Sequence, residues 1–144
     1  MPLPLPAPGL VIGYAYLWRH EARRGQEEGR KDRPCVIVLS VQDVAGMTVV
    51  TVAPITHAPP ERSDMAVEIP ADTKRRLGLD GAQSWIITGD LNRFVWPGVD
   101  LRPTRLATRD YAYGMLPKSL YQQVRDRVLE LARAGRAGVT GRDG

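Results

Sequence analysis

Residues 29–40 read GRKDRPCVIVLS, a charged loop that passes through an Arg-Pro step into a continuous apolar run. The five residues from Cys35 to Leu39 are aliphatic or β-prone, and such a run predicts a strand that is buried on both faces. Pro34 fixes its own φ and disfavours helical backbone at Arg33. We therefore expect Arg33 at the rigid entrance of a buried strand, where its guanidinium is available to bind a ligand.

Two neighbouring segments also have strand patterns. Residues 10–18 (LVIGYAYLW) are aromatic and β-branched, and Gly13 within them suggests a bulge. The charged segment 19–32 has no apolar face and predicts a long exposed loop with at most one helical turn. Residues 48–53 (TVVTVA) resume the strand pattern. The three strands are expected to form an antiparallel meander.

The third strand is expected to end at Pro54, because proline cannot donate a hydrogen bond to a sheet ladder. Thr56 and His57 would then lie on a short rigid segment beyond the sheet edge. In an antiparallel pair the start of one strand lies beside the end of the next, so Arg33 and Thr56 should converge. A guanidinium fork and a hydroxyl together can bind a phosphate. In RNA cleavage through the ribose 2′-OH, such groups can stabilise the phosphorane and assist proton transfer.

The rest of the chain predicts a mainly β fold with a C-terminal helix. Apolar residues recur at helical spacing over residues 117–134, and Gly135 provides a stop. The members of this apolar stripe are Leu120, Val124, Val128 and Leu131. Weaker patterns predict strands over 65–69, 84–88 and 92–95 and a helical turn over 71–77. Strands separated by turns at intervals of about ten residues suggest a small barrel or sandwich.

Length and composition favour one domain. The chain has 144 residues, of which 43% are apolar, enough for one core and too few for two ordinary domains. We expect the domain over residues 10–134, after an extended Pro-rich arm over 1–9 and before a disordered, glycine-rich tail over 135–144. The net charge of +4 permits a phosphate-bearing partner without requiring one.

Cysteine content and hydropathy indicate the compartment. Cys35 is the one cysteine, which excludes a disulfide framework within the chain and fits a reducing cytoplasm. No apolar run approaches the ~20 residues that cross a bilayer, and the prolines of residues 2–8 do not form a signal segment. We expect a soluble, cytoplasmic protein that is not associated with membrane.

Several specific signatures are missing from the sequence. It contains no P-loop, HExxH, paired CxxC or GxSxG motif, which argues against common nucleotide-binding, zinc-hydrolase and serine-hydrolase sites. With His20 and His57 as the two histidines, a multi-histidine metal site is difficult to assemble. We expect neither a metal nor a cofactor.

Each candidate residue also has an ordinary structural interpretation. Arg33 can pair with Asp32 or Glu28 at the surface, and the Thr56 hydroxyl can cap the following turn. His57 can be a half-exposed turn residue. The cationic residues of the loop are typical of a solvated surface as well as of an RNA clamp; they are Arg19, Arg23, Arg24, Arg30 and Lys31. The aromatic side chains of Trp85, Phe94 and Trp96 can pack in the core or stack on bases.

The order of these features resembles the PemK/MazF family of toxin endoribonucleases. The shared features begin with a first strand, a charged loop with Gly-Gln-Glu-Glu-Gly at 25–29, and Lys-Asp-Arg-Pro at 31–34. The strand 35–40 and Val-Ala-Pro-Ile-Thr at 52–56 follow. A weaker match continues through Val-Glu-Ile at 67–69, Gly-Leu at 78–79, Ser-Trp-Ile-Ile at 84–87 and the terminal helix.

This resemblance implies an SH3-like barrel with a C-terminal helix, usually a homodimer. It also implies a toxin that cleaves single-stranded RNA without metal and is neutralised by a cognate antitoxin. The family's functional arginine and threonine fall on Arg33 and Thr56. The loop before Arg33 corresponds to the family's loop beside the RNA and antitoxin surface. We therefore expect RNA-binding roles for Glu27, Glu28, Arg30 and Lys31, and also for His57, which follows Thr56.

Two other functions remain open on the same fold. A gyrase poison of the CcdB type shares the barrel but acts by binding a topoisomerase, and an inactive barrel would only bind RNA or a partner. The gyrase poisons depend on aromatic and helical residues at the end of the chain, whereas this chain ends in a polar, glycine-rich tail. Arg33 and Thr56 together favour the nuclease.

Overall fold

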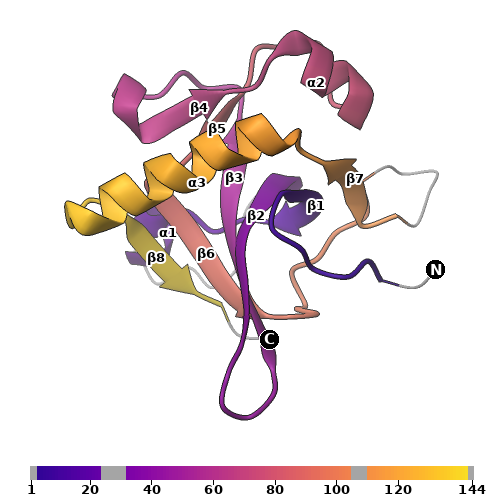
Figure 1. The fold of residues 1–144 in the computed structure, drawn as a ribbon, viewed down its shortest axis with the longest axis vertical. Coiled ribbons are helices and arrows are strands. Elements are labelled where there is room, and N and C mark those ends of the chain that lie inside the picture. Colours follow the sequence, from indigo (N-terminus) through magenta and orange to yellow (C-terminus); the bar gives the residue numbers. More distant parts are fainter. Residues whose placement is uncertain (1–2, 24–31, 105–109, 143–144) are drawn as a thin grey trace.

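The computed structural model describes residues 3–23, 32–104 and 110–142, whose strands form one strongly curled sheet (Figure 1). The strands are β1 (Leu10–Ala15), β2 (Asp32–Gln42), β3 (Thr48–Thr56), β4 (Ala66–Glu68), β5 (Trp85–Ile87), β6 (Asp90–Val95), β7 (Ala112–Met115) and β8 (Gly138–Gly141). The helices are α1 (Arg19–Arg23), α2 (Ala71–Leu77) and α3 (Lys118–Arg133), with a 3-10 turn η1 (Ser63–Met65). This half-barrel with a C-terminal helix is the mainly β fold that the sequence predicts.

The antiparallel meander of β1, β2 and β3 is the centre of the sheet, as predicted. Cys35 of β2 is opposite Ile12 of β1 on one side and opposite Pro54 of β3 on the other. Side chains alternate across a strand, so Cys35 and Ile37 enter one core cluster and Val36 and Val38 enter the other. Burial of β2 on both faces is therefore confirmed for residues 35–38.

The third strand does not end at Pro54, as expected, but continues to Thr56. Its first half pairs with β6 as far as Val52, and its last residues, from Ile55, pair with β5. Pro54 lies between these two ladders, so its missing N–H interrupts neither of them. The change of partner also curls the sheet and attaches the small ladder of β4 and β5 to the end of β3.

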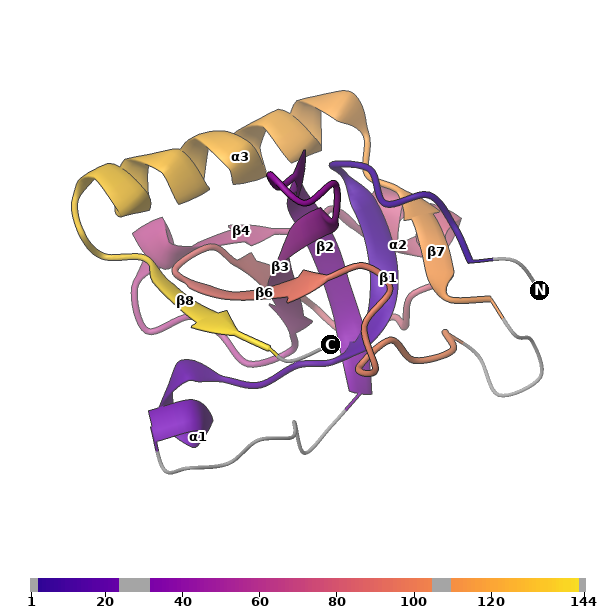
Figure 2. The ribbon, with the colours of Figure 1, turned by 90° about the horizontal axis from the view of Figure 1, so that it is seen from below.

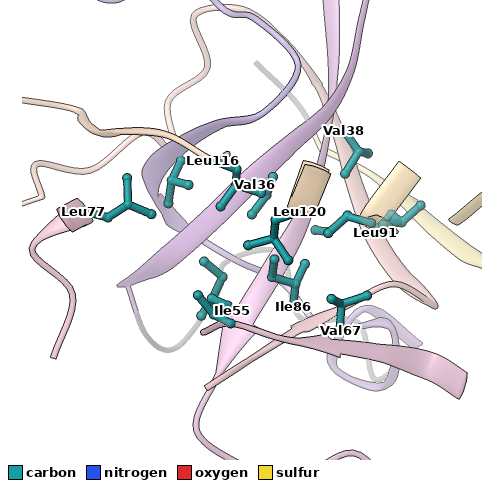
Figure 3. Close-up of a cluster of buried hydrophobic side chains, with 13 residues drawn as sticks. Val36, Val38, Ile55, Val67, Leu77, Ile86, Leu91, Leu116 and Leu120 are labelled. Carbon is teal, nitrogen blue, oxygen red and sulfur yellow. The ribbon is translucent and has the colours of Figure 1, made fainter. Parts of the chain in front are cut away.

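The helix α3 covers one face of the sheet, and its predicted apolar stripe faces the core. Leu120, Val124 and Leu131 are buried, and Val128 packs against the same cluster. Gly135, with φ of +69°, follows the helix end, as predicted. Figure 3 shows Leu120 among side chains from several strands; the labelled ones include Val36, Ile55, Val67, Ile86 and Leu91. No helix in the described residues is both long and apolar enough to cross a membrane.

The opposite face of the meander holds a second cluster that is rich in aromatic rings. Tyr14 and Phe94 stack with ring centroids 4.8 Å apart, and Phe94 also contacts Trp96. Phe94 is thus buried in the core, which is the first of the two roles considered for it from the sequence. Gly13 of β1 lies beside this cluster, where a Cβ atom would approach the Arg102 carbonyl oxygen to 2.3 Å. The Arg102 backbone therefore approaches β1 too closely for any side chain at position 13, which explains the glycine there.

The expectation of a disordered tail from residue 135 is wrong for residues 138–142. Residues Gly138–Gly141 form β8, which pairs in parallel with β6 (Figure 2). The next residue, Arg142, is 9% exposed and forms an ion pair with Asp100. The tail is ordered because it completes an edge of the sheet and buries its arginine. The strand β7, which pairs with β1, is also absent from the sequence prediction.

Candidate functional site

Arg33 and Thr56 converge at one end of the β2–β3 pair, as the strand directions predict. At this end the ladder pairs Cys35 with Pro54. Two residues back along β2 and two residues forward along β3, Arg33 lies opposite Thr56. Both residues line a cavity of about 530 Å³, together with His57. Neighbouring residues of β2 and β3 also line the cavity, and the opposite wall comes from α2, the loop after it and the chain near Tyr113.

The Arg33 guanidinium is held against an aromatic ring. Its central carbon lies 5.1 Å from the centroid of Trp18, an arrangement that orients the planar cation. Its Nε is buried and has no hydrogen-bond partner among the described residues. Asp32, the surface partner considered from the sequence, lies 3.5 Å from Arg102 instead. An anion in the cavity would therefore bind the terminal N–H groups of Arg33, because the covered Nε cannot reach it.

Thr56 is the last residue of β3, and its hydroxyl is oriented by the next turn. Its Oγ1 accepts a hydrogen bond of 3.1 Å from the Ala58 backbone N–H. This bond confirms that Thr56 caps the following turn. In this bond the hydroxyl oxygen acts only as an acceptor. The hydroxyl proton can still be donated to a ligand.

Three linked polar side chains that the sequence does not predict lie in the same cavity. The His57 imidazole Nε2 is 2.8 Å from Asp80 Oδ2, and Lys74 Nζ is 2.9 Å from Asp80 Oδ1. Lys74 belongs to α2, its side chain is only 6% exposed, and it also donates to the Ala82 carbonyl and to Ser84 Oγ. The hydrogen bond from Lys74 lowers the pKa of Asp80. The Asp80 carboxylate is therefore charged at every pH at which an ordinary aspartate is charged.

The sequence gives one weak indication that Lys74 is buried and needs partners. It precedes Leu77 by three residues, so it lies on the apolar side of a helical turn, where an unpaired lysine would be unfavourable. The partners that satisfy it lie six to ten residues later in the chain. No local pattern identifies them.

Replacing Lys74 with methionine is expected to destabilise the fold by about 2–3 kcal/mol, because the buried Ser84 hydroxyl and the acceptors of Asp80 and Ala82 lose a donor that is itself buried. The free energy of unfolding from urea titration measures the effect. Lys118→Met is the matched control, since Lys118 is exposed at the start of α3 and should change stability by less than about 0.5 kcal/mol. Equal stability of the two variants would contradict a structural role for Lys74.

A second cavity, of about 570 Å³, lies beside the first and shares Thr56 and Ala58 with it. It is lined in part by Trp18, by the cationic side chains of Arg19, Arg62 and Arg136, and by the acidic residues Glu61 and Asp90. Arg62 and Arg136 both pair with Asp64. An extended ligand at Thr56 would therefore meet an aromatic ring and positive charge on this side.

Four of the residues expected to bind RNA lie outside the described residues. Glu27, Glu28, Arg30 and Lys31 belong to the segment 24–31, between the end of α1 and the start of β2. Of the residues that the sequence singled out, the structure brings together Arg33, Thr56 and His57. In residues 3–23, 32–104 and 110–142, no group of three or more His, Cys, Asp or Glu side chains is arranged to hold a metal ion.

Comparison with protein families places the chain. A family model described as PemK-like, MazF-like toxin of type II toxin-antitoxin system matches residues 16–95. A search of curated proteins gives no match. The matched segment includes Arg33, Thr56, His57, Lys74 and Asp80, and so nearly all of the cavity lining.

Proposed function

Because this chain belongs to the PemK-like, MazF-like toxins of type II toxin-antitoxin systems, we propose that it is an endoribonuclease that cleaves single-stranded RNA. Membership of this family implies a cognate antitoxin as its partner. We expect the toxin to act as a homodimer in the cytoplasm, and the segment with Glu27, Glu28, Arg30 and Lys31 to hold the RNA strand.

The observation that carries this proposal is the meeting of Arg33 and Thr56 in one cavity. The guanidinium of Arg33 provides N–H donors at the cavity wall, and the hydroxyl beside it retains its proton. Two such donors match the non-bridging oxygens of a phosphodiester. As the ribose 2′-oxygen attacks phosphorus, negative charge grows on these oxygens, and donors fixed in advance stabilise that charge.

The two residues have distinct roles in this scheme. Arg33 binds the scissile phosphate through its fork and neutralises the phosphorane, with its orientation set by Trp18. Thr56 donates to one non-bridging oxygen, with its orientation set by the Ala58 N–H. Neither role requires a metal ion. The products would be a 2′,3′-cyclic phosphate and a 5′-hydroxyl.

Incubation of the purified protein with end-labelled single-stranded RNA in the presence of a chelator tests the proposal. We expect fragments with 2′,3′-cyclic phosphate ends, and no cleavage at positions where the ribose is 2′-deoxy. RNA that stays intact across diverse sequences would contradict the proposal. In that case inhibition of gyrase supercoiling would instead indicate a topoisomerase poison.

Replacing Thr56 with valine is expected to lower the rate constant of RNA cleavage by about 10²-fold, since one phosphate donor is lost at nearly constant shape. Thr56→Ser keeps the hydroxyl and should stay within about tenfold of the wild type. Single-turnover cleavage at saturating enzyme measures both rate constants. A Thr56→Val protein that cleaves as fast as Thr56→Ser would exclude the hydroxyl from the reaction.

A further inference from the structure

His57 has a fixed environment that phosphate binding by Arg33 and Thr56 does not explain. Its side chain is 52% exposed, yet its Nε2 lies 2.8 Å from Asp80 Oδ2 at the wall of the same cavity. A half-exposed histidine next to Thr56 is free to rotate unless another group holds it. Asp80 is the group that holds the ring.

Asp80 is itself immobilised. Its Oδ1 accepts hydrogen bonds from Lys74 Nζ and from the Ala82 backbone N–H, at 2.9 and 3.1 Å. Lys74 is buried, and its three donors serve Asp80, Ala82 and Ser84. One carboxylate oxygen is thus fixed to the protein, while the other faces the imidazole.

The orientation of the ring determines which nitrogen can react. When Nε2–H donates to a carboxylate, the neutral imidazole has its lone pair on Nδ1. The carboxylate also stabilises the imidazolium that forms when Nδ1 accepts a proton. A carboxylate, an imidazole and a nearby hydroxyl of the substrate are the components of general base catalysis.

We propose that His57 is the general base of the RNA cleavage, with Asp80 as its positioning residue; this inference rests on the proposed function. His57 Nδ1 removes the proton from the ribose 2′-OH while the 2′-oxygen forms a bond to phosphorus and the bond from phosphorus to the 5′-oxygen breaks. A water molecule protonates the leaving 5′-oxygen. The resulting hydroxide takes the proton from the imidazolium, which restores neutral His57.

Three other polar groups that line the cavity, those of Arg33, Lys74 and Tyr113, fit this role less well. Arginine stays protonated at any physiological pH, so Arg33 cannot act as a base. Lys74 uses all of its donors within the protein, and the Tyr113 hydroxyl donates to the Thr104 carbonyl. Histidine is the side chain that exchanges a proton most readily near neutral pH.

Chemical rescue can test the proposal. Replacing His57 with alanine is expected to lower the single-turnover rate constant by about 10²-fold or more, and added imidazole should restore much of it. The RNA concentration for half-maximal rate should change little, because the base acts mainly in the transition state. His57→Gln can still donate to Asp80 but cannot accept the proton, so it should be as slow as His57→Ala.

Two further variants separate positioning from structure. Asp80→Asn is expected to slow cleavage by about tenfold without rescue by imidazole, because the ring is present but less well oriented and stabilised. Asp72→Asn is the matched control, since Asp72 is an exposed residue of α2 that pairs with Arg75 and does not line the cavity. It should cleave at the wild-type rate.

The results distinguish failure of this inference from failure of the proposed function. If the wild type cleaves and Arg33→Ala does not, but His57→Ala cleaves normally, the nuclease stands and His57 is not its base. Wild-type activity in His57→Gln would also overturn the inference. It would show that position 57 needs only a hydrogen bond to Asp80 and not a base. If the wild type leaves all RNA intact, the proposed function fails and the role of His57 fails with it.

Discussion

Replacing Arg33 with alanine is expected to lower the rate constant of RNA cleavage by about 10³-fold or more. In the proposed reaction, the substitution removes the cation that would neutralise the phosphorane and the fork that would bind two phosphate oxygens together. It also leaves one face of Trp18 without the guanidinium that lies 5.1 Å from its ring. Single-turnover cleavage of labelled RNA at saturating enzyme measures the chemical step without a contribution from binding.

Two controls make this result specific. Arg33→Lys keeps the charge but not the planar fork, so it should recover only a small part of the rate. Arg75→Ala removes the same charge from an exposed position on α2 that lies outside both cavities, and it should cleave normally. Arg33→Ala that retains its fold and cleaves within about tenfold of the wild type would exclude Arg33 from the transition state.

Replacing Arg142 with methionine is expected to destabilise the protein by about 3–5 kcal/mol. Its guanidinium donates to the Ala15 carbonyl and to Asn92 Oδ1, both at 2.9 Å, and lies 5.6 Å from the Tyr14 ring. Its Nη2 is 2.8 Å from an oxygen of Asp100, whose side chain is 9% exposed. Loss of Arg142 would leave the Asp100 carboxylate buried without the cation that neutralises it, which is unfavourable.

Urea titration measures this loss, with the midpoint moving to lower concentration at nearly constant slope. Arg125→Met is the matched control, because Arg125 pairs with Asp126 on an exposed part of α3 and should cost at most about 0.5 kcal/mol. If Arg142→Met were as stable as Arg125→Met, the C-terminal strand would not contribute to the core. A chain that stops before Gly138 should then also be stable.

The parts of the fold that follow from local pattern could be predicted from the sequence. The apolar run after Arg33 and the pattern at 48–53 identify adjacent antiparallel strands, and strand direction alone then brings Arg33 and Thr56 together. The helical spacing from Leu120 to Leu131 similarly identifies α3 and its buried face. These features depend on periodicity, which a single sequence shows directly.

The remaining features depend on partners far along the chain. β8 has two glycines and no strong strand pattern, and it forms because β6 offers an open edge and Arg142 reaches Asp100. The extension of β3 through Pro54 depends on where its two partner ladders meet. Lys74 and Asp80 belong to the site only because the loop after α2 folds back on the helix.

The change of partner along β3 means that the cavity spans two ladders of unequal size. Arg33 of β2 and Thr56 of β3 both belong to the long meander, and Thr56 also pairs with Trp85 in the three-residue strand β5. Short ladders open more readily than long ones, and such local opening leaves the rest of a fold intact. Opening of β5 would remove the pairing of Thr56 with Trp85, while the closed meander still holds Thr56 opposite Arg33. The alignment of Arg33 with Thr56 would therefore follow the stability of the β2–β3 pair rather than the stability of the short β5 ladder.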